Sequence, residues 1–305
     1  MTYIEFKNQI IKDLREYLPS ETTVTFRTVF KNNDMELDGL VIMEPEINIS
    51  PTLYLNYYYE EMLNGTKYEV LFNKVIRDYE NNKPEINFDT SLFYDFAAVK
   101  DKVVFKIVNT SSNKHMLSKI PHIEFLDLSI IFYIIYDEYP IENGSILVQN
   151  NFLQMWDIDV DEIHRIALYN TPKLLPGYIS NIIDIASQLA DECDSDLFAL
   201  SQEDDYFPMY VLTNEKKTFG ASAILYPDIL KVFSDKIGSD LYILPSSIHE
   251  VILVPAFENL SVKDLFDMVS EVNDTLVMDE EILSDNVYRF IREESQITCC
   301  AHPDD

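Results

Sequence analysis

The stretch from Val211 to Val254 constrains the fold more than any other part of the chain. It reads VLTN, a short polar loop, FGASAILYPDILKVFSDKI and then DLYILPSSIHEVILVP, so apolar, β-rich runs alternate with one amphipathic helix. Polar residues collect where these elements end, at 213–214, 220–221 and 246–250. A rigid scaffold commonly presents a site in this way, although strand ends and turns without any site look the same. We expect the three groups to lie together on one side of a sheet.

Helical and extended patterns are mixed irregularly along the rest of the chain. This mixture predicts an α+β fold with largely antiparallel sheets and packed helices. At 305 residues the chain can form one large domain or two ordinary ones. We expect an N-terminal helix and hairpin lobe over 1–100 and a main α+β portion over 101–296, with a weak internal break near 172–177. An acidic tail over 297–305 follows.

Capping signals and hydrophobic periodicity place the individual elements. Thr2 and Glu5 form a capping box ahead of a helix over 3–18. A strand over 23–30 and its antiparallel partner over 36–43 are joined by a polar hairpin turn. Further helices are expected to begin at Ser50-Pro51, near 68, near 90, at the cap Asp159 and at the cap Ser261. Two more are expected to span 178–192 and 284–291. The further expected strands cover 103–108, 123–136 and 145–149.

Charge is the strongest signal in the composition. The 23 Lys and Arg residues stand against 53 Asp and Glu residues, which gives a net charge of −30. Contact with a phosphate backbone requires clustered Lys and Arg, which are missing, so we expect no direct binding to nucleic acid. A surface this negative can instead mimic nucleic acid and occupy the basic groove of another protein, or it can serve solubility alone. The partner class that fits is a basic or nucleic-acid-binding protein.

The expected compartment follows from several missing signals. No apolar run approaches the roughly 20 residues of a membrane-spanning helix, and the first residues do not have the basic-then-apolar layout of a signal peptide. Cys193, Cys299 and Cys300 are too few for a disulfide framework. We therefore expect a cytoplasmic protein without a membrane partner.

Motifs for metals, phosphates and nucleotide cofactors are also missing. The histidines form no HExxH pair and the cysteines no CxxC pair. Residues 34–39 start like a calcium loop, but Pro45 stands where a bidentate Glu is required. Neither GxGxxG nor GxxxxGK occurs, so we expect neither a metal site nor a cofactor.

His249 and its neighbours are the best candidates for chemistry. Ser246, Ser247 and Glu250 stand close to it in the sequence, and His122 lies beside another apolar strand. If the two strands were neighbours, their imidazoles and carboxylates would converge on one metal ion or one proton-transfer centre. The other interpretation makes both histidines core or strand-end residues and the serines part of a tight turn. A GxSxG elbow is missing, and in a strand Ser247 and His249 would be about 7 Å apart, too far for a direct hydrogen bond.

Seven segments together resemble a bacterial family of the Firmicutes, domain of unknown function 5688. They are NNDMELDGLVI, ISPTLYLNYYYEEMLNG, IPHIEFLDLSIIF, VLTNEKKTFGASAILYPDIL, YILPSSIHEVILVP, MVSEVN and LSDNVYRFI, and the resemblance covers residues 3–292. The C-terminal segments are also similar to another uncharacterised bacterial family, the YtpQ-like proteins. Neither resemblance implies an activity, a cofactor or a set of catalytic residues.

Two functions stay open. The first is a non-enzymatic acidic protein that binds or inhibits another macromolecule, acting as a nucleic-acid mimic. The second is a hydrolase-like or proton-transfer enzyme with its site around His249 and Glu250. In that enzyme the catalytic residues are His249, Glu250 and Ser247, and the binding residues are Asn214, Gly220, Ser246 and His122. The first function is favoured because no recognised catalytic constellation is present.

Overall fold

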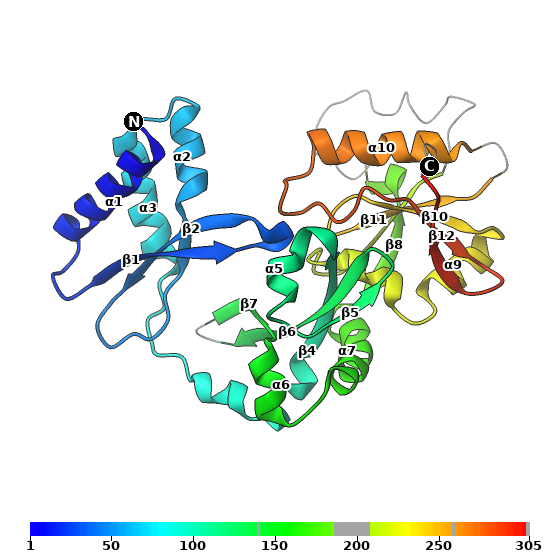
Figure 1. Ribbon diagram of the computed structural model, residues 1–305, viewed down its shortest axis with the longest axis horizontal. Coiled ribbons are helices and arrows are strands. Elements are labelled where there is room, and N and C mark those ends of the chain that lie inside the picture. Colours follow the sequence, from blue (N-terminus) through cyan, green and yellow to red (C-terminus); the bar gives the residue numbers. More distant parts are fainter. Residues whose placement is uncertain (139–140, 186–207, 258–259, 303–305) are drawn as a thin grey trace. The chain divides into compact units, whose positions relative to one another are not determined.

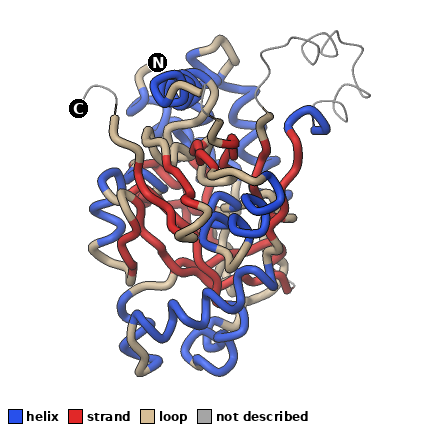
Figure 2. Tube along the Cα trace, turned by 90° about the vertical axis from the view of Figure 1, so that its right-hand side faces the viewer, coloured by secondary structure: helices blue, strands red, loops and turns tan. Residues whose placement is uncertain are grey.

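The computed structural model describes residues 1–138, 141–185, 208–257 and 260–302. Helices and antiparallel sheets are interspersed along the chain, which confirms the expected α+β class (Figure 1, Figure 2). The chain divides into two compact units. The first contains Met1–Asp95 and Tyr136–Gly144, and the second contains Phe96–Ile135 and Ser145–Asp305. Within the described residues, no helix combines the length and the apolar character needed to cross a bilayer.

The first unit packs helices on a three-stranded antiparallel sheet with the order β1-β2-β3. Its elements are α1 (Tyr3–Tyr17), β1 (Thr23–Phe30), η1 (Asn32–Asp34), β2 (Glu36–Met43), β3 (Thr52–Tyr54), α2 (Leu55–Leu63), α3 (Tyr68–Asn82) and η2 (Thr90–Tyr94). The predicted capping box is confirmed. The Thr2 hydroxyl accepts a hydrogen bond from the Glu5 N–H, and the Glu5 carboxylate accepts one from the Thr2 N–H.

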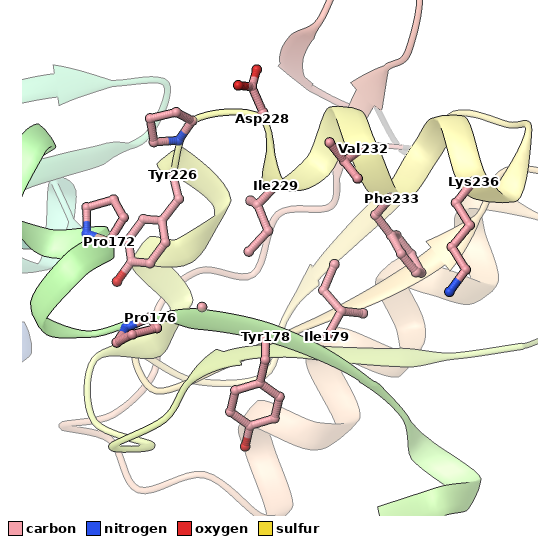
Figure 3. A pocket seen from close by; sticks show the side chains of 12 residues that line it. Pro172, Pro176, Tyr178, Ile179, Tyr226, Asp228, Ile229, Val232, Phe233 and Lys236 are labelled. Carbon is pink, nitrogen blue, oxygen red and sulfur yellow. The ribbon is translucent and has the colours of Figure 1, made fainter.

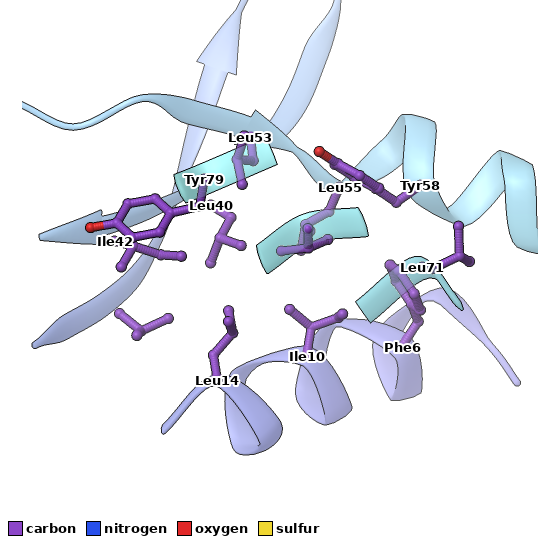
Figure 4. Close-up of a cluster of buried hydrophobic side chains, with 12 residues drawn as sticks. Phe6, Ile10, Leu14, Leu40, Ile42, Leu53, Leu55, Tyr58, Leu71 and Tyr79 are labelled. Atoms are coloured by element: carbon purple, nitrogen blue, oxygen red, sulfur yellow. The ribbon is translucent and has the colours of Figure 1, made fainter. Parts of the chain in front are cut away.

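The core of the first unit joins one face of α1 to one face of the sheet (Figure 4). Phe6, Ile10 and Leu14 recur every four residues, so they project from the same side of the helix. Leu40 and Ile42 alternate along β2 and project from one side of the sheet. All five side chains are buried. The two periodicities that predicted this helix and this strand therefore also define the core.

The second unit contains two antiparallel sheets. The larger has the strand order β13-β12-β10-β11-β9-β8, and the smaller has the order β4-β6-β5 with β7 paired to β6. The strands are β4 (Val103–Asn109), β5 (His122–Phe125), β6 (Leu128–Glu138), β7 (Ile141–Leu147), β8 (Gly177–Asn181), β9 (Tyr210–Asn214), β10 (Leu241–Pro245), β11 (Val251–Pro255), β12 (Tyr288–Ile291) and β13 (Gln296–Cys299). The end of β6 and the start of β7 belong to the first unit. The helices are α4 (Phe96–Val99), η3 (Lys100–Lys102), η4 (Ser111–Asn113), α5 (Lys114–Leu117), α6 (Asn150–Trp156), α7 (Val160–Leu174), η6 (Gly220–Leu225), α9 (Ile229–Ile237) and α10 (Val262–Thr275).

Helices cover both faces of the larger sheet. On one face, Phe266 and Val269 of α10 pack with Tyr242 of β10. On the other face, the ring of Phe233 in α9 contacts the ring of Tyr210 in β9, with centroids 4.9 Å apart. The predicted caps of two helices are confirmed. Asp159 caps α7 by accepting from the Glu162 N–H, and Ser261 caps α10 by accepting from the Asp264 N–H.

The single strand expected over 123–136 is in fact a hairpin. β5 and β6 pair antiparallel, and the turn between them contains Leu126 and Asp127. Leu126 has a φ of 56°, which belongs to the left-handed region and reverses the chain. The continuous apolar pattern hid this turn.

Three expected helix positions are also wrong. The helix after Ser50 begins only at Leu55, because 52–54 pair with β2 as β3 and the Ser50 hydroxyl donates to the carbonyl of Ile42. Residues 177–181 form β8, so the helix expected from 178 begins only at 182; the part expected over 186–192 lies outside the described residues. Residues 288–291 form β12 rather than a helix.

Residues 296–299, near the end of the described chain, are paired as well. β13 pairs with β12, so the stretch that we expected to be a tail begins inside a strand. Cys299 and Cys300 are free thiols, and Cys193 lies outside the described residues.

Candidate functional site

Three segments of the second unit meet around His249. Its carbonyl oxygen accepts a hydrogen bond from Thr213 Oγ1 at 2.8 Å, and its ring Nδ1 accepts one from the backbone N–H of Phe219 at 3.1 Å. The Ala221 N–H donates to the Ile248 carbonyl at 3.3 Å. The end of β9, the start of η6 and the connection between β10 and β11 therefore lie together, as the positions of their polar residues predicted.

Gly220 permits this close approach. A Cβ atom at this position would overlap with Thr213 Oγ1 and would lie 2.5 Å from the His249 carbonyl oxygen and 2.7 Å from the Asn214 nitrogen. The last two are backbone atoms, which cannot turn aside. The visible role of Gly220 is thus steric.

Asn214 holds the loop that follows β9. Its side chain is fully buried. Nδ2 donates to the Thr218 carbonyl at 2.8 Å, and Oδ1 accepts from the Thr218 N–H at 3.3 Å. Both polar groups of this expected binding residue are therefore used within its own loop.

An aromatic stack accompanies the bond between His249 and Phe219. The two rings are nearly parallel, at 14°, with centroids 5.6 Å apart. Lys106 Nζ lies 3.7 Å from the centroid of the Phe219 ring, and the Tyr133 ring meets Phe219 edge-on at 5.5 Å. Phe219 has a φ of 54°, a left-handed conformation that costs about 1–2 kcal/mol in a residue other than glycine. These contacts hold the strained residue in place.

Glu281 is the carboxylate partner of His249. Because Nδ1 accepts an N–H, the neutral imidazole carries its proton on Nε2. Nε2 lies 3.4 Å from Glu281 Oε1, and the two side chains are 29% and 31% exposed. The Glu281 carbonyl also accepts a hydrogen bond from the Ile248 N–H at 2.8 Å. Sequence reasoning selected the adjacent Glu250 instead, because nothing in the sequence marks so distant a partner.

Ser246, Ser247 and Glu250 form the turn between β10 and β11. The backbone N–H groups of both serines donate to the Glu250 carbonyl, at 3.3 and 3.2 Å. Ser247 Oγ accepts from the backbone N–H of His249 at 3.0 Å. Among the described residues, no hydrogen bond joins this hydroxyl to the imidazole of His249. The contacts match the tight-turn interpretation of these residues.

His122 is not brought to this site. It lies in β5 opposite Ile131, and its Nδ1 is 3.1 Å from the Ile120 carbonyl oxygen. In the part of the chain that the structure describes, no interaction joins it to His249, and no group of three or more His, Cys, Asp or Glu side chains is arranged to hold a metal ion.

A second polar cluster, which sequence reasoning missed, follows Glu281 along the chain. Asp127 Oδ2 accepts hydrogen bonds from Ser284 Oγ at 2.7 Å and from Asn286 Nδ2 at 2.9 Å, and its Oδ1 accepts one from the Tyr288 hydroxyl at 2.8 Å. Burial, reinforced by the charge of Asp127, raises the pKa of Tyr288 far above its ordinary value, so the phenol remains a donor. In the sequence, the only signal for this cluster is Asp127, an acidic residue that interrupts an apolar run.

Chemically, the site around His249 offers one partly exposed imidazole and carboxylate pair. This pair can hold a proton at Nε2, whereas the Ser247 hydroxyl and the Asn214 amide already serve the turn and the loop. The surrounding polar groups mainly satisfy one another, as expected of a buried network.

A family model matches residues 3–292 of the chain, and its description is a family of unknown function (DUF5688). Comparisons with curated proteins and with solved structures give no match. The resemblance of the C-terminal segments to YtpQ-like proteins is not shown by these comparisons. The family match brings no activity and no catalytic residues with it.

Proposed function

We propose that this chain, which belongs to this family of unknown function, is a non-enzymatic acidic protein that binds a basic protein partner. The observation that carries the proposal is the solvent side of α10. The partner of the chain is a nucleic-acid-binding protein, because an acidic surface can occupy the basic groove of such a protein in place of nucleic acid. We place this interaction in the cytoplasm, without a membrane partner, on the sequence grounds given above.

Acidic residues line the outer side of α10 at helical spacing. Asp264, Asp267, Glu271 and Asp274 are all exposed, and steps of three and four residues place them on one face. Within the described residues, none of these four carboxylates forms an ion pair with Lys or Arg. From 262 to 285 the chain has eight acidic residues and a single basic one, Lys263, so this segment carries more negative charge per residue than the chain as a whole.

Apolar side chains are exposed beside these carboxylates. Leu276, directly after α10, is 79% exposed, and Met268 and Met278 are also exposed. Methionine adapts its shape to different partners. Carboxylates without ion-pair partners beside exposed apolar groups favour a binding partner that carries both Lys or Arg and apolar side chains. The net charge of −30 would steer such a partner toward the protein.

The test compares two variants with equal changes in net charge. D264N/D267N/E271Q/D274N neutralises the α10 face, and E21Q/E60Q/E69Q/D101N neutralises four exposed acidic residues elsewhere. The probe is a Lys/Arg-rich helical peptide with leucines on one side, and its binding is measured by fluorescence anisotropy at low and physiological salt. The wild type and the control should bind alike, with an affinity that falls as salt rises. The α10 variant should bind about tenfold more weakly. Equal affinities of the two variants, or binding that salt does not change, would refute the proposal.

One observation favours the enzyme as a second candidate, namely the partly exposed pair of His249 and Glu281. A hydrolase would cleave activated ester or phosphate substrates faster than its H249N and E281Q variants do. The proposed binding role predicts the same background rate for all three proteins. A wild-type rate that depends on both residues would support the enzyme instead.

A further inference from the structure

We propose that a pocket between β8 and α9 binds a small amphipathic carboxylate, whose apolar body lies against aliphatic and aromatic side chains and whose charge pairs with Lys236. This site is separate from the acidic face of α10. It does not depend on the proposed binding of a basic protein.

The pocket has a volume of about 470 Å³, within the range of small-molecule sites. Pro172 and Pro176 lie at one end and Lys236 at the other (Figure 3). Ile229 and Phe233 lie between the two ends and form an apolar wall. A ligand that fills this space therefore contacts apolar groups along its length and a cation at one terminus.

Regular spacing on the two elements builds the walls. Ile229, Phe233 and Lys236 occur at steps of four and three residues, so they project from one side of α9. Gly177 and Ile179 alternate along β8 and share the face of the strand that lines the pocket. A Cβ atom on Gly177 would lie 2.9 Å from Ile229 Cδ1, so a side chain at 177 would push into the space. The glycine keeps the pocket open.

Charge selects the ligand class. Lys236 is exposed and forms no ion pair within the described residues, whereas Lys231 on the same helix pairs with Asp235 at 2.7 Å. Asp228 also lines the pocket, but its carboxylate points away from the space in Figure 3. In a chain with a net charge of −30, a lysine without an ion-pair partner at the end of an apolar pocket favours an anionic group.

Two further residues fit this ligand. Val232 lines the pocket and is 66% exposed, so an apolar ligand would cover a surface that is now in water. The ring of Tyr226 forms part of the wall, and its hydroxyl is buried. Burial raises the pKa of Tyr226 to about 12, against a smaller lowering by the neighbouring Ser222 and Asn214. The phenol thus stays neutral and does not repel a carboxylate.

The experiment titrates the full chain with 4-phenylbutyrate and with its uncharged amide, 4-phenylbutyramide, by ligand-observed NMR. The wild type should bind both probes saturably and should prefer the acid roughly threefold, as expected for one partly exposed ion pair. K236Q should bind both probes equally. K231Q, which makes the same charge change on the same helix, should keep the preference.

Two further variants test the apolar part of the site. V232Q alters an exposed side chain and should weaken the binding of both probes without affecting folding. G177V should abolish the binding of both, with its folding checked by circular dichroism. The proposal is overturned if neither probe binds saturably, if K236Q and K231Q change the preference equally, or if V232Q leaves both affinities unchanged.

Discussion

Gly220 has backbone of two other segments packed directly against its Cα. Replacement by alanine forces a Cβ atom against the His249 carbonyl oxygen and the Asn214 nitrogen. We expect G220A to lower the free energy of unfolding by about 3 kcal/mol, because an overpacked backbone contact has to open. Urea denaturation of the full chain measures this change.

Gly238 provides the matched control for G220A. It lies in the same unit and has a φ of 83°, and a Cβ atom added to it would have no neighbour within 4 Å. G238A should therefore cost only the left-handed conformation of alanine, about 1 kcal/mol. Equal losses for the two variants would mean that the crowding around Gly220 relaxes freely.

His164 should make stability depend on pH. Its Nε2 is buried without a hydrogen-bond partner among the described residues, and burial lowers its pKa below 6.5, against a smaller raising by Asp161. The unfolded chain then binds a proton more readily than the folded chain, so the free energy of unfolding falls as pH drops below 6.5. Urea denaturation between about pH 7.5 and about pH 5.5 should show this fall in the wild type and a smaller one in H164Q. Identical slopes would contradict the assignment to His164.

At the residue scale, the sequence predicted where polar groups gather but not how they pair. Because Asn214, Gly220 and 246–250 stand at the ends of elements, the sequence was enough to predict that they lie together. The pairing of His249 with Glu281 and the αL conformation of Phe219 depend on packing between distant segments. No local sequence pattern predicts packing between distant segments.

Among the elements, those whose stabilising contacts are local were predicted well. The caps Thr2, Asp159 and Ser261 each act within one turn of their helix, so a few letters of sequence contain the whole interaction. β8 and β12 were mistaken for helices because their hydrogen bonds go to other strands.

The Asp127 carboxylate ties the hairpin of β5 and β6 to residues 284–288, which lead into β12 and include its first residue. Its three donors, Ser284, Asn286 and Tyr288, all lie in that later segment. D127N keeps the size of the side chain but turns one acceptor atom into a donor that faces a donor. We expect the free energy of unfolding to fall by about 2–3 kcal/mol.

The matched control for D127N is D274N, which changes an exposed carboxylate of α10 and should stay within about 0.5 kcal/mol of the wild type. Both variants are measured by urea denaturation. Similar values for the two variants would show that the Asp127 cluster adds nothing to stability.

For the whole molecule, the net charge of −30 predicts a stability that rises with salt. Like charges repel most strongly in the compact state. Because the screening length shortens from ~30 Å at 0.01 M to ~8 Å at 0.15 M, added salt weakens this repulsion. The midpoint of thermal unfolding should rise by several degrees over this range, equally in sodium chloride and tetramethylammonium chloride. A midpoint that is flat or that falls would show that specific ion pairs outweigh the excess charge.

The first unit is built from two separated pieces of chain, Met1–Asp95 and Tyr136–Gly144. The later piece supplies Tyr136, whose ring lies 5.0 Å from that of Phe88 and 6.4 Å from that of Phe93. A gene truncated after codon 95 would encode a fragment in which these two phenylalanines lose their contacts with the Tyr136 ring. Recombination at that codon would separate these phenylalanines from Tyr136, so the first unit is inherited intact only together with the segment that carries residue 136.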